Sequence, residues 1–166
     1  MLKALKPLSS RKVVARQLCA ELMARARRPE FFLRLGVPDT MDGRFDLVAL
    51  HAWLALERLE TDRVLAQALI DENFVSFDEA LRALGTGDIG MNRRLKTMAG
   101  AFYGRLQAYR SASDREALAD AIHRNLYRRA QGREAEARAI AIYAIAARSH
   151  LVSAEGKLDF GPLPLM

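Results

Sequence analysis

The sequence predicts an all-α fold, a single-domain bundle of about six to seven helices around one central apolar helix. Helix-forming Leu, Ala, Arg and Glu dominate the 166 residues, and only five prolines and ten glycines interrupt them. Apolar residues recur at steps of three and four through most of the chain, which is the helical period. With 51% apolar and 28% charged residues, the composition is that of a soluble globular protein.

The first half of the chain predicts three helices. A first helix over about 10–27 is capped by Ser10, and a short helical turn follows Pro29 and stops at Gly36. A loop over 37–43 leads into the next helix, about 42–60. Between its Asp46 and Glu57 every residue except His51 is apolar. Because a helix that is apolar on all sides is buried, this helix is predicted to be the centre of the core.

The second half predicts three or four more elements. Thr61 or Asp62 caps a helix that continues toward residue 84, where glycines end it. A motif helix covers about 91–112, and the capping box formed by Ser113 and Glu116 opens a helix that Gly132 ends. A last helix, rich in small residues, covers about 134–151. The domain therefore spans 10–151, followed by an extended, loosely held tail over 152–166.

The positive charge is concentrated at the N-terminus. Residues 1–28, a basic arm and first helix within the domain, hold eight Lys and Arg against Glu21 alone, whereas the other 138 residues hold 18 basic and 19 acidic. This segment is either a solvated helix face or a contact for an anionic surface such as lipid headgroups or RNA. The candidate contacts are Lys3, Lys6, Arg11, Lys12 and Arg16.

No catalytic, metal or cofactor site is predicted. The three histidines fall on three different predicted helices, and Cys19 is the only cysteine. His51, on the apolar helix, is expected to be a core histidine with its hydrogen bonds satisfied. The glycines over 85–90 lack the preceding strand and the Lys-Ser pair of a phosphate loop, so they predict a helix end and a turn.

Two polar groups are candidates for binding. Asp39, Asp42, Asp46 and Arg44 gather at a helix entrance, either as a charge-balanced cap or as the rim of a binding surface.

On the motif helix, Tyr103 and Arg105 lie off the main apolar stripe and are candidates for interaction. Gly104 between them predicts a close approach by another element.

Several ungapped motifs, in order, carry a family resemblance. They are Gly-Val-Pro-Asp-Thr-x-Asp-Gly-Arg-Phe (36–45), Leu-x-Leu-x-Arg-Leu (54–59), Gly-Asp-x-Gly (87–90), Ala-Phe-Tyr-Gly-Arg-Leu-x-Ala-Tyr (101–109) and Arg-Asn-Leu-Tyr (124–127). The chain resembles the ubiquinol–cytochrome c chaperone family over about 22–127.

The resemblance implies a non-enzymatic assembly factor for respiratory complex III, one that binds newly made cytochrome b. It also implies a small partner protein or the ribosome as further partners. The short form is similar to a bacterial member that is cytoplasmic and peripheral at the inner membrane. We do not expect DNA as a partner.

The client surface is placed on the helix-entrance turn together with one side of the motif helix. Its residues are Asp39, Asp42, Arg44, Asp46, Tyr103, Arg105, Tyr109 and Arg124. Alternatives remain: a helical carrier of a quinone or lipid, which needs an enclosed apolar pocket, and a membrane- or RNA-associated module built on the basic arm. An enzyme whose site escapes sequence analysis is a remote further possibility.

Overall fold

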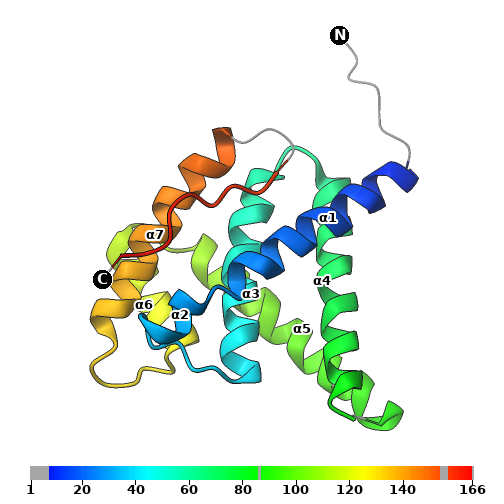
Figure 1. Cartoon of the computed structure of the whole chain (residues 1–166), viewed down its shortest axis with the longest axis horizontal. Coiled ribbons are helices and arrows are strands. Elements are labelled where there is room, and N and C mark those ends of the chain that lie inside the picture. The colour runs from blue at the N-terminus through cyan, green and yellow to red at the C-terminus, as the bar shows by residue number, and fades with distance from the viewer. Residues whose placement is uncertain (1–7, 86, 154–156, 166) are drawn as a thin grey trace.

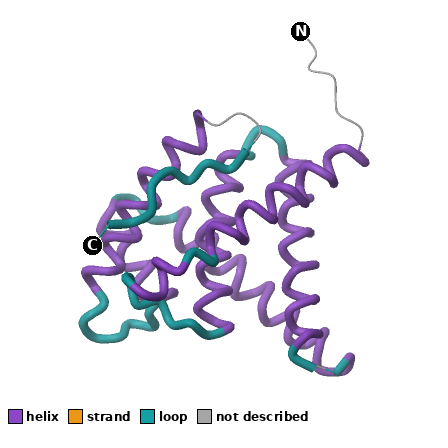
Figure 2. The backbone as a smooth tube through the Cα atoms, viewed as in Figure 1, coloured by secondary structure: helices purple, strands orange, loops and turns teal. Residues whose placement is uncertain are grey.

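The computed structural model describes residues 8–85, 87–153 and 157–165. All regular structure in these ranges is helical, which confirms the predicted fold class (Figure 2). The seven helices labelled in Figure 1 are α1 (Leu8–Ala26), α2 (Pro29–Leu33), α3 (Met41–Arg58), α4 (Arg63–Ala83), α5 (Asp88–Arg110), α6 (Arg115–Leu126) and α7 (Glu134–Ser153).

Helix α3 is the centre of the molecule, as its composition predicts. Every residue from Leu47 to Leu56 is buried, and α1, α5, α6 and α7 all pack against this helix. Asp62 caps the next helix, because its carboxylate accepts a hydrogen bond from the backbone N–H of Leu65 at 3.1 Å. Helix α4 in turn packs on α1 and α5, and α6 packs on α7.

Helix α6 differs from its predicted bounds at both ends. Its cap is Asp114 rather than Ser113, and the Asp114 carboxylate accepts from the Ala117 N–H at 2.8 Å. The helix ends at Leu126, six residues before Gly132. Arg128 and Arg129 adopt φ of 53° and 58°, a left-handed backbone that cannot continue a right-handed helix.

The C-terminal segment over 157–165 is extended but it is not loosely held, so that part of the prediction is wrong. The Leu158 N–H donates to the Glu21 carboxylate at 2.8 Å, and Arg25 Nη2 donates to the Gly161 carbonyl at 2.7 Å. Phe160 is 3% exposed. In Figure 1 this segment, in red, runs beside α7. The C-terminal segment therefore lies on the outside of the helical bundle and links α1 to the buried core.

Candidate binding surfaces

The turn before α3 is built around two glycines. Gly36 has φ +59°, a conformation that other residues rarely adopt. The Thr40 hydroxyl accepts from the Gly43 N–H at 3.1 Å and caps the helix. A Cβ on Gly43 would lie 1.9 Å from the Pro38 carbonyl oxygen, so only glycine fits where the loop crosses the first turn of α3.

Asp39, Asp42 and Arg44 are exposed on this turn. Arg44 Nε donates to Asp39 at 2.7 Å, and this hydrogen bond lowers the pKa of the Asp39 carboxyl. Leu33 of α2, which is 83% exposed, lies beside the pair. Together with Phe32 they border a shallow hollow of about 270 Å³. The turn is therefore both a capped helix entrance and an accessible edge.

Asp46 does not belong to that surface. It is fully buried, with Arg105 Nε 2.5 Å from one carboxylate oxygen and Arg128 Nη1 2.7 Å from the other. Burial raises the pKa of the Asp46 carboxyl, and the two guanidinium groups oppose that shift. Arg105 also covers the Phe45 ring at 5.2 Å. Asp46 and Arg105 thus join α3, α5 and the turn after α6, and the surface role predicted for Asp46 is wrong.

The other candidate residues on α5 also differ in how far they are exposed. Tyr109 is 1% exposed and packs against Trp53 at 5.5 Å between ring centroids, so it is a core residue and not a contact for a client. Burial raises its phenol pKa. Apart from the neighbouring residues and backbone of α5 itself, no described atom lies within 4 Å of a Cβ built on Gly104, so the predicted close approach by another element is wrong. Tyr103 is 48% exposed and stacks on Phe74 at 6.4 Å.

Tyr103 borders the largest hollow described, a groove of about 950 Å³ that we call the four-helix groove. It is lined by residues of α3, α4, α5 and α7 and of the turn between α3 and α4: Leu54, Leu56, Glu57, Arg58, Leu59, Glu60, Arg63, Ala66, Ile70, Tyr103, Leu106, Gln107, Arg110, Arg148 and Leu151. The sequence does not indicate this groove, because its walls come from helices that are distant in the chain.

The charged side chains that line the four-helix groove do not all pair with one another. Glu57 accepts from Trp53 Nε1 at 3.0 Å and pairs with Arg148 at 2.7 Å. Arg63 and Arg110, on α4 and α5, form no ion pair with any residue that the structure describes. The groove therefore combines aliphatic side chains with two cations available to a ligand.

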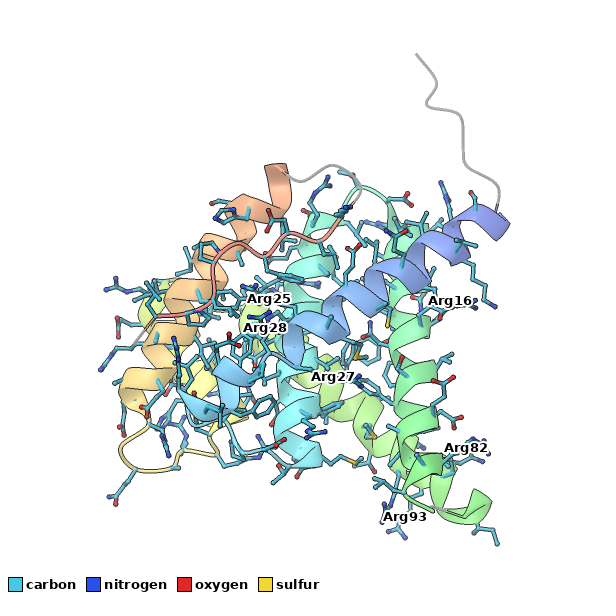
Figure 3. All side chains as sticks on the ribbon, in the orientation of Figure 1. Arg16, Arg25, Arg27, Arg28, Arg82 and Arg93 are labelled. Atoms are coloured by element: carbon cyan, nitrogen blue, oxygen red, sulfur yellow. The ribbon has the colours of Figure 1, made fainter. Side chains whose placement is uncertain are left out.

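The predicted basic arm is only partly described, since Lys3 and Lys6 lie outside the described residues. Arg11 lies 3.9 Å from Asp62. Arg16, which Figure 3 labels on α1, lies 3.5 Å from Glu72 of α4. Both cations are partly neutralised within the molecule. Lys12 is exposed.

The last predicted client residue, Arg124, is exposed on α6. Its guanidinium pairs with Asp120 at 3.4 Å, four residues earlier on the same helix. Asp120 also pairs with Arg129 at 3.1 Å, on the turn after α6. Arg124 therefore remains available at the surface, but it lines neither of the two hollows described above.

His51 is the satisfied core histidine that the sequence predicts. Its Nδ1 lies 2.7 Å from the Leu47 carbonyl and its Nε2 lies 2.9 Å from the Tyr143 hydroxyl. Arg25 Nε donates to the same hydroxyl at 2.9 Å. Burial lowers the pKa of His51 to about 4, so the ring is neutral at physiological pH.

The described ranges hold neither a candidate metal site nor a candidate membrane span. Among the described residues, no group of three or more His, Cys, Asp or Glu side chains has a geometry that suits a metal ion. No described helix combines the length and the hydropathy that crossing a bilayer requires.

Comparison with known proteins identifies the family of this chain. The profile of the ubiquinol–cytochrome c chaperone family matches residues 33–157. Ubiquinol–cytochrome c reductase complex assembly factor 1 of Mus musculus is 24% identical over 122 residues, which are 70% of this chain and 41% of that protein. The Xenopus laevis protein of the same name is 23% identical over 121 residues, 69% of this chain and 60% of that protein.

The fold has a counterpart among solved structures. The crystal structure of the Cbp3 homolog from Brucella abortus superposes with a TM-score of 0.77 at 33% identity, covering 89% of this chain and 84% of that one. The chain spans only 41% to 60% of the length of the two curated relatives. Since the family profile covers most of the chain and the fold agrees, the chain belongs to the ubiquinol–cytochrome c chaperone family.

Proposed function

We propose that this protein is an assembly chaperone that binds newly made cytochrome b and supports assembly of ubiquinol–cytochrome c reductase, respiratory complex III. Membership of the chaperone family supports the role, as do the names of the curated relatives. The structural observation that carries the proposal is the four-helix groove, lined by exposed Tyr103 and by Arg63 and Arg110, which form no ion pair within the described ranges.

The groove has the properties of a site for a polypeptide segment. Ala66 and Ile70, both half-buried, supply apolar surface along it, and burial of such surface drives association. Tyrosine and arginine are the side chains that most often dominate the energy of protein interfaces. A client segment with an apolar face and an acidic residue would satisfy both the aliphatic lining and the two cations.

The turn with Asp39, Asp42 and Arg44 is proposed as a second contact, with Arg124 as a further one. The turn borders a different hollow from the one that Tyr103 lines, so we propose the two as separate contacts. This arrangement replaces the single surface expected from the sequence.

The place of action follows from the client. Because cytochrome b is a membrane protein, we propose that the chaperone works in the cytoplasm, peripherally at the inner membrane. A small partner protein and the ribosome are proposed further partners. Lys12, an exposed cation of the described basic arm, is the side chain that we propose for contact with an anionic surface.

Deletion of the gene tests the function. We expect selective loss of the cytochrome b signal in difference spectra of membranes, with other respiratory complexes retained. The chain expressed in trans should restore the signal. An unchanged spectrum in the deletion strain would remove the proposed function.

Paired variants test the surfaces separately. Tyr103→Ala with Arg63→Glu alters the four-helix groove, and Arg44→Ala with Asp39→Ala alters the turn. All four side chains are at least partly exposed, so both variants are expected to fold. We expect the groove variant to lose most co-purification of cytochrome b. Arg34→Glu, an exposed charge reversal that lines neither hollow, is the control. Normal co-purification by the groove variant would exclude the groove as the client site.

A further inference from the structure

The connection between α4 and α5 carries apolar side chains into solvent. Leu84, just after α4, is 63% exposed, and Ile89, in the first turn of α5, is 99% exposed. Figure 1 shows this connection at the lower right, where the two helices extend past the rest of the bundle. We call Leu84, Ile89 and the glycines between them the α4–α5 tip. Leu81 and Met91, each 2% exposed, hold the ends of the two helices in place beneath it.

Cations surround the α4–α5 tip. Over residues 82–96 the sequence holds Arg82, Arg93, Arg94 and Lys96 and a single acid, Asp88. Arg82 pairs with Asp78 at 2.8 Å and remains 57% exposed. Arg93 and Lys96 form no ion pair with any residue in the described ranges. Figure 3 shows Arg82 and Arg93 at this same end of the molecule.

We propose that the α4–α5 tip is a membrane-contact element that inserts Leu84 and Ile89 among the headgroups of an anionic bilayer. Aliphatic side chains gain free energy at the boundary between headgroups and acyl chains, and flanking Lys and Arg are attracted to anionic phosphates. The fully exposed Ile89 has no described partner that covers it. The charge around it complements a phospholipid surface.

A protein partner fits the tip less well than a lipid surface does. Stable protein interfaces bury at least about 1,000 Å² in total, with a well-packed apolar centre. The tip offers two aliphatic side chains on a narrow projection, which is enough for insertion at a membrane surface. Single weak membrane signals give only reversible binding, so the tip is expected to act together with a second contact such as Lys12. This inference does not depend on which client the groove binds.

Binding to vesicles tests the tip. The purified full chain is sedimented with vesicles of phosphatidylcholine mixed with phosphatidylglycerol, and with vesicles of phosphatidylcholine alone. We expect binding to the mixed vesicles only. Leu84→Ser with Ile89→Ser should weaken it by about tenfold, and Arg93→Gln with Lys96→Gln by a similar factor that shrinks at high salt.

Two controls separate the tip from other surfaces. Ile142→Ser removes a 54% exposed aliphatic side chain from α7 and is expected to leave vesicle binding unchanged. Lys12→Gln measures the contribution of the basic arm. The proposal is overturned if the double serine variant binds as well as the unaltered chain, or if Lys12→Gln alone reduces binding. It is also overturned if the unaltered chain binds neither kind of vesicle.

A tryptophan at the tip reports insertion directly. In Ile89→Trp the indole should move its emission to shorter wavelength on mixed vesicles and be quenched by brominated lipid. Trp53 is 2% exposed and contributes a constant background that the unaltered chain measures. Emission that stays at its aqueous wavelength while the protein is bound would place the tip outside the bilayer and overturn the proposal.

Discussion

Single buried polar residues determine how the helices of this protein meet. Asp46 forms ion pairs with Arg105 of α5 and with Arg128 of the turn after α6, and His51 forms a hydrogen bond with Tyr143 of α7. Each contact joins α3 to an element distant in sequence. Groups of this kind stabilise one arrangement because leaving any member unpaired inside the protein costs free energy.

Asp46→Ala tests the first of these contacts. The change leaves two cations without their carboxylate, and we expect the free energy of unfolding to fall by about 2 kcal/mol. This is below the usual cost of breaking a buried pair because the Arg128 side chain is 49% exposed and can be hydrated. Urea unfolding measures the loss. Asp42→Ala, at an exposed position one turn earlier on α3, should cost less than half as much, and equal losses would contradict the prediction.

His51 predicts a dependence of stability on pH. Its pKa is about 4 in the folded state against 6.5 for the free side chain, so the unfolded state binds the proton more readily. Stability from this group is therefore complete above about pH 6.5 and is lost as the pH falls toward 4, by roughly 3 kcal/mol in total. Urea unfolding across this range measures it. His51→Gln should show a flatter dependence, and an identical one would refute the assignment.

At the scale of elements, two glycines predict opposite effects of the same substitution. Gly43→Ala places a methyl group against the Pro38 carbonyl and should destabilise the protein by about 2 kcal/mol or more. Gly104→Ala adds a methyl group to an exposed helix position with open space around it, and should stabilise by up to about 1 kcal/mol. Thermal unfolding of both variants measures the difference. A loss of stability in Gly104→Ala would show that the site is not open.

The elements themselves were largely predictable from local sequence. The run from Leu47 to Leu56 indicates a central helix without any knowledge of its neighbours, because burial on all sides needs apolar residues on all sides. The end of α6 was not predictable, since nothing local announces the left-handed backbone of Arg128 and Arg129. The order in the C-terminal segment also depends on distant partners, Glu21 and Arg25 on α1.

The described residues form the four-helix groove, the hollow beside Asp39 and Arg44, and the projecting α4–α5 tip. The four-helix groove is open to solvent and its walls include Arg58, Arg63, Arg110 and Arg148. A carrier of a quinone or lipid would instead enclose its ligand in an apolar cavity. The arrangement therefore favours binding of a polypeptide segment over transport of a small apolar molecule.

A thermal-shift measurement distinguishes these two roles. Decylubiquinone, added to the full chain at concentrations below its solubility limit, is expected to leave the unfolding temperature unchanged. A true ligand at a hundred times its Kd would stabilise the protein by about 2.7 kcal/mol. Detergent at matched concentration controls for non-specific effects. A saturable increase with the quinone alone would support the carrier role instead.

The sequence by itself determined the helical class, the central helix, the hydrogen-bonded core histidine and the family, because these depend on local periodicity, composition and short motifs. Only the tertiary structure decided which polar residues face inward. The client surface expected from the sequence includes Asp46 and Tyr109 together with the exposed Arg44 and Tyr103, yet Asp46 and Tyr109 are buried. The physical reason is that a charged or aromatic group is buried where distant helices supply its partners, and one sequence does not reveal which helices will meet.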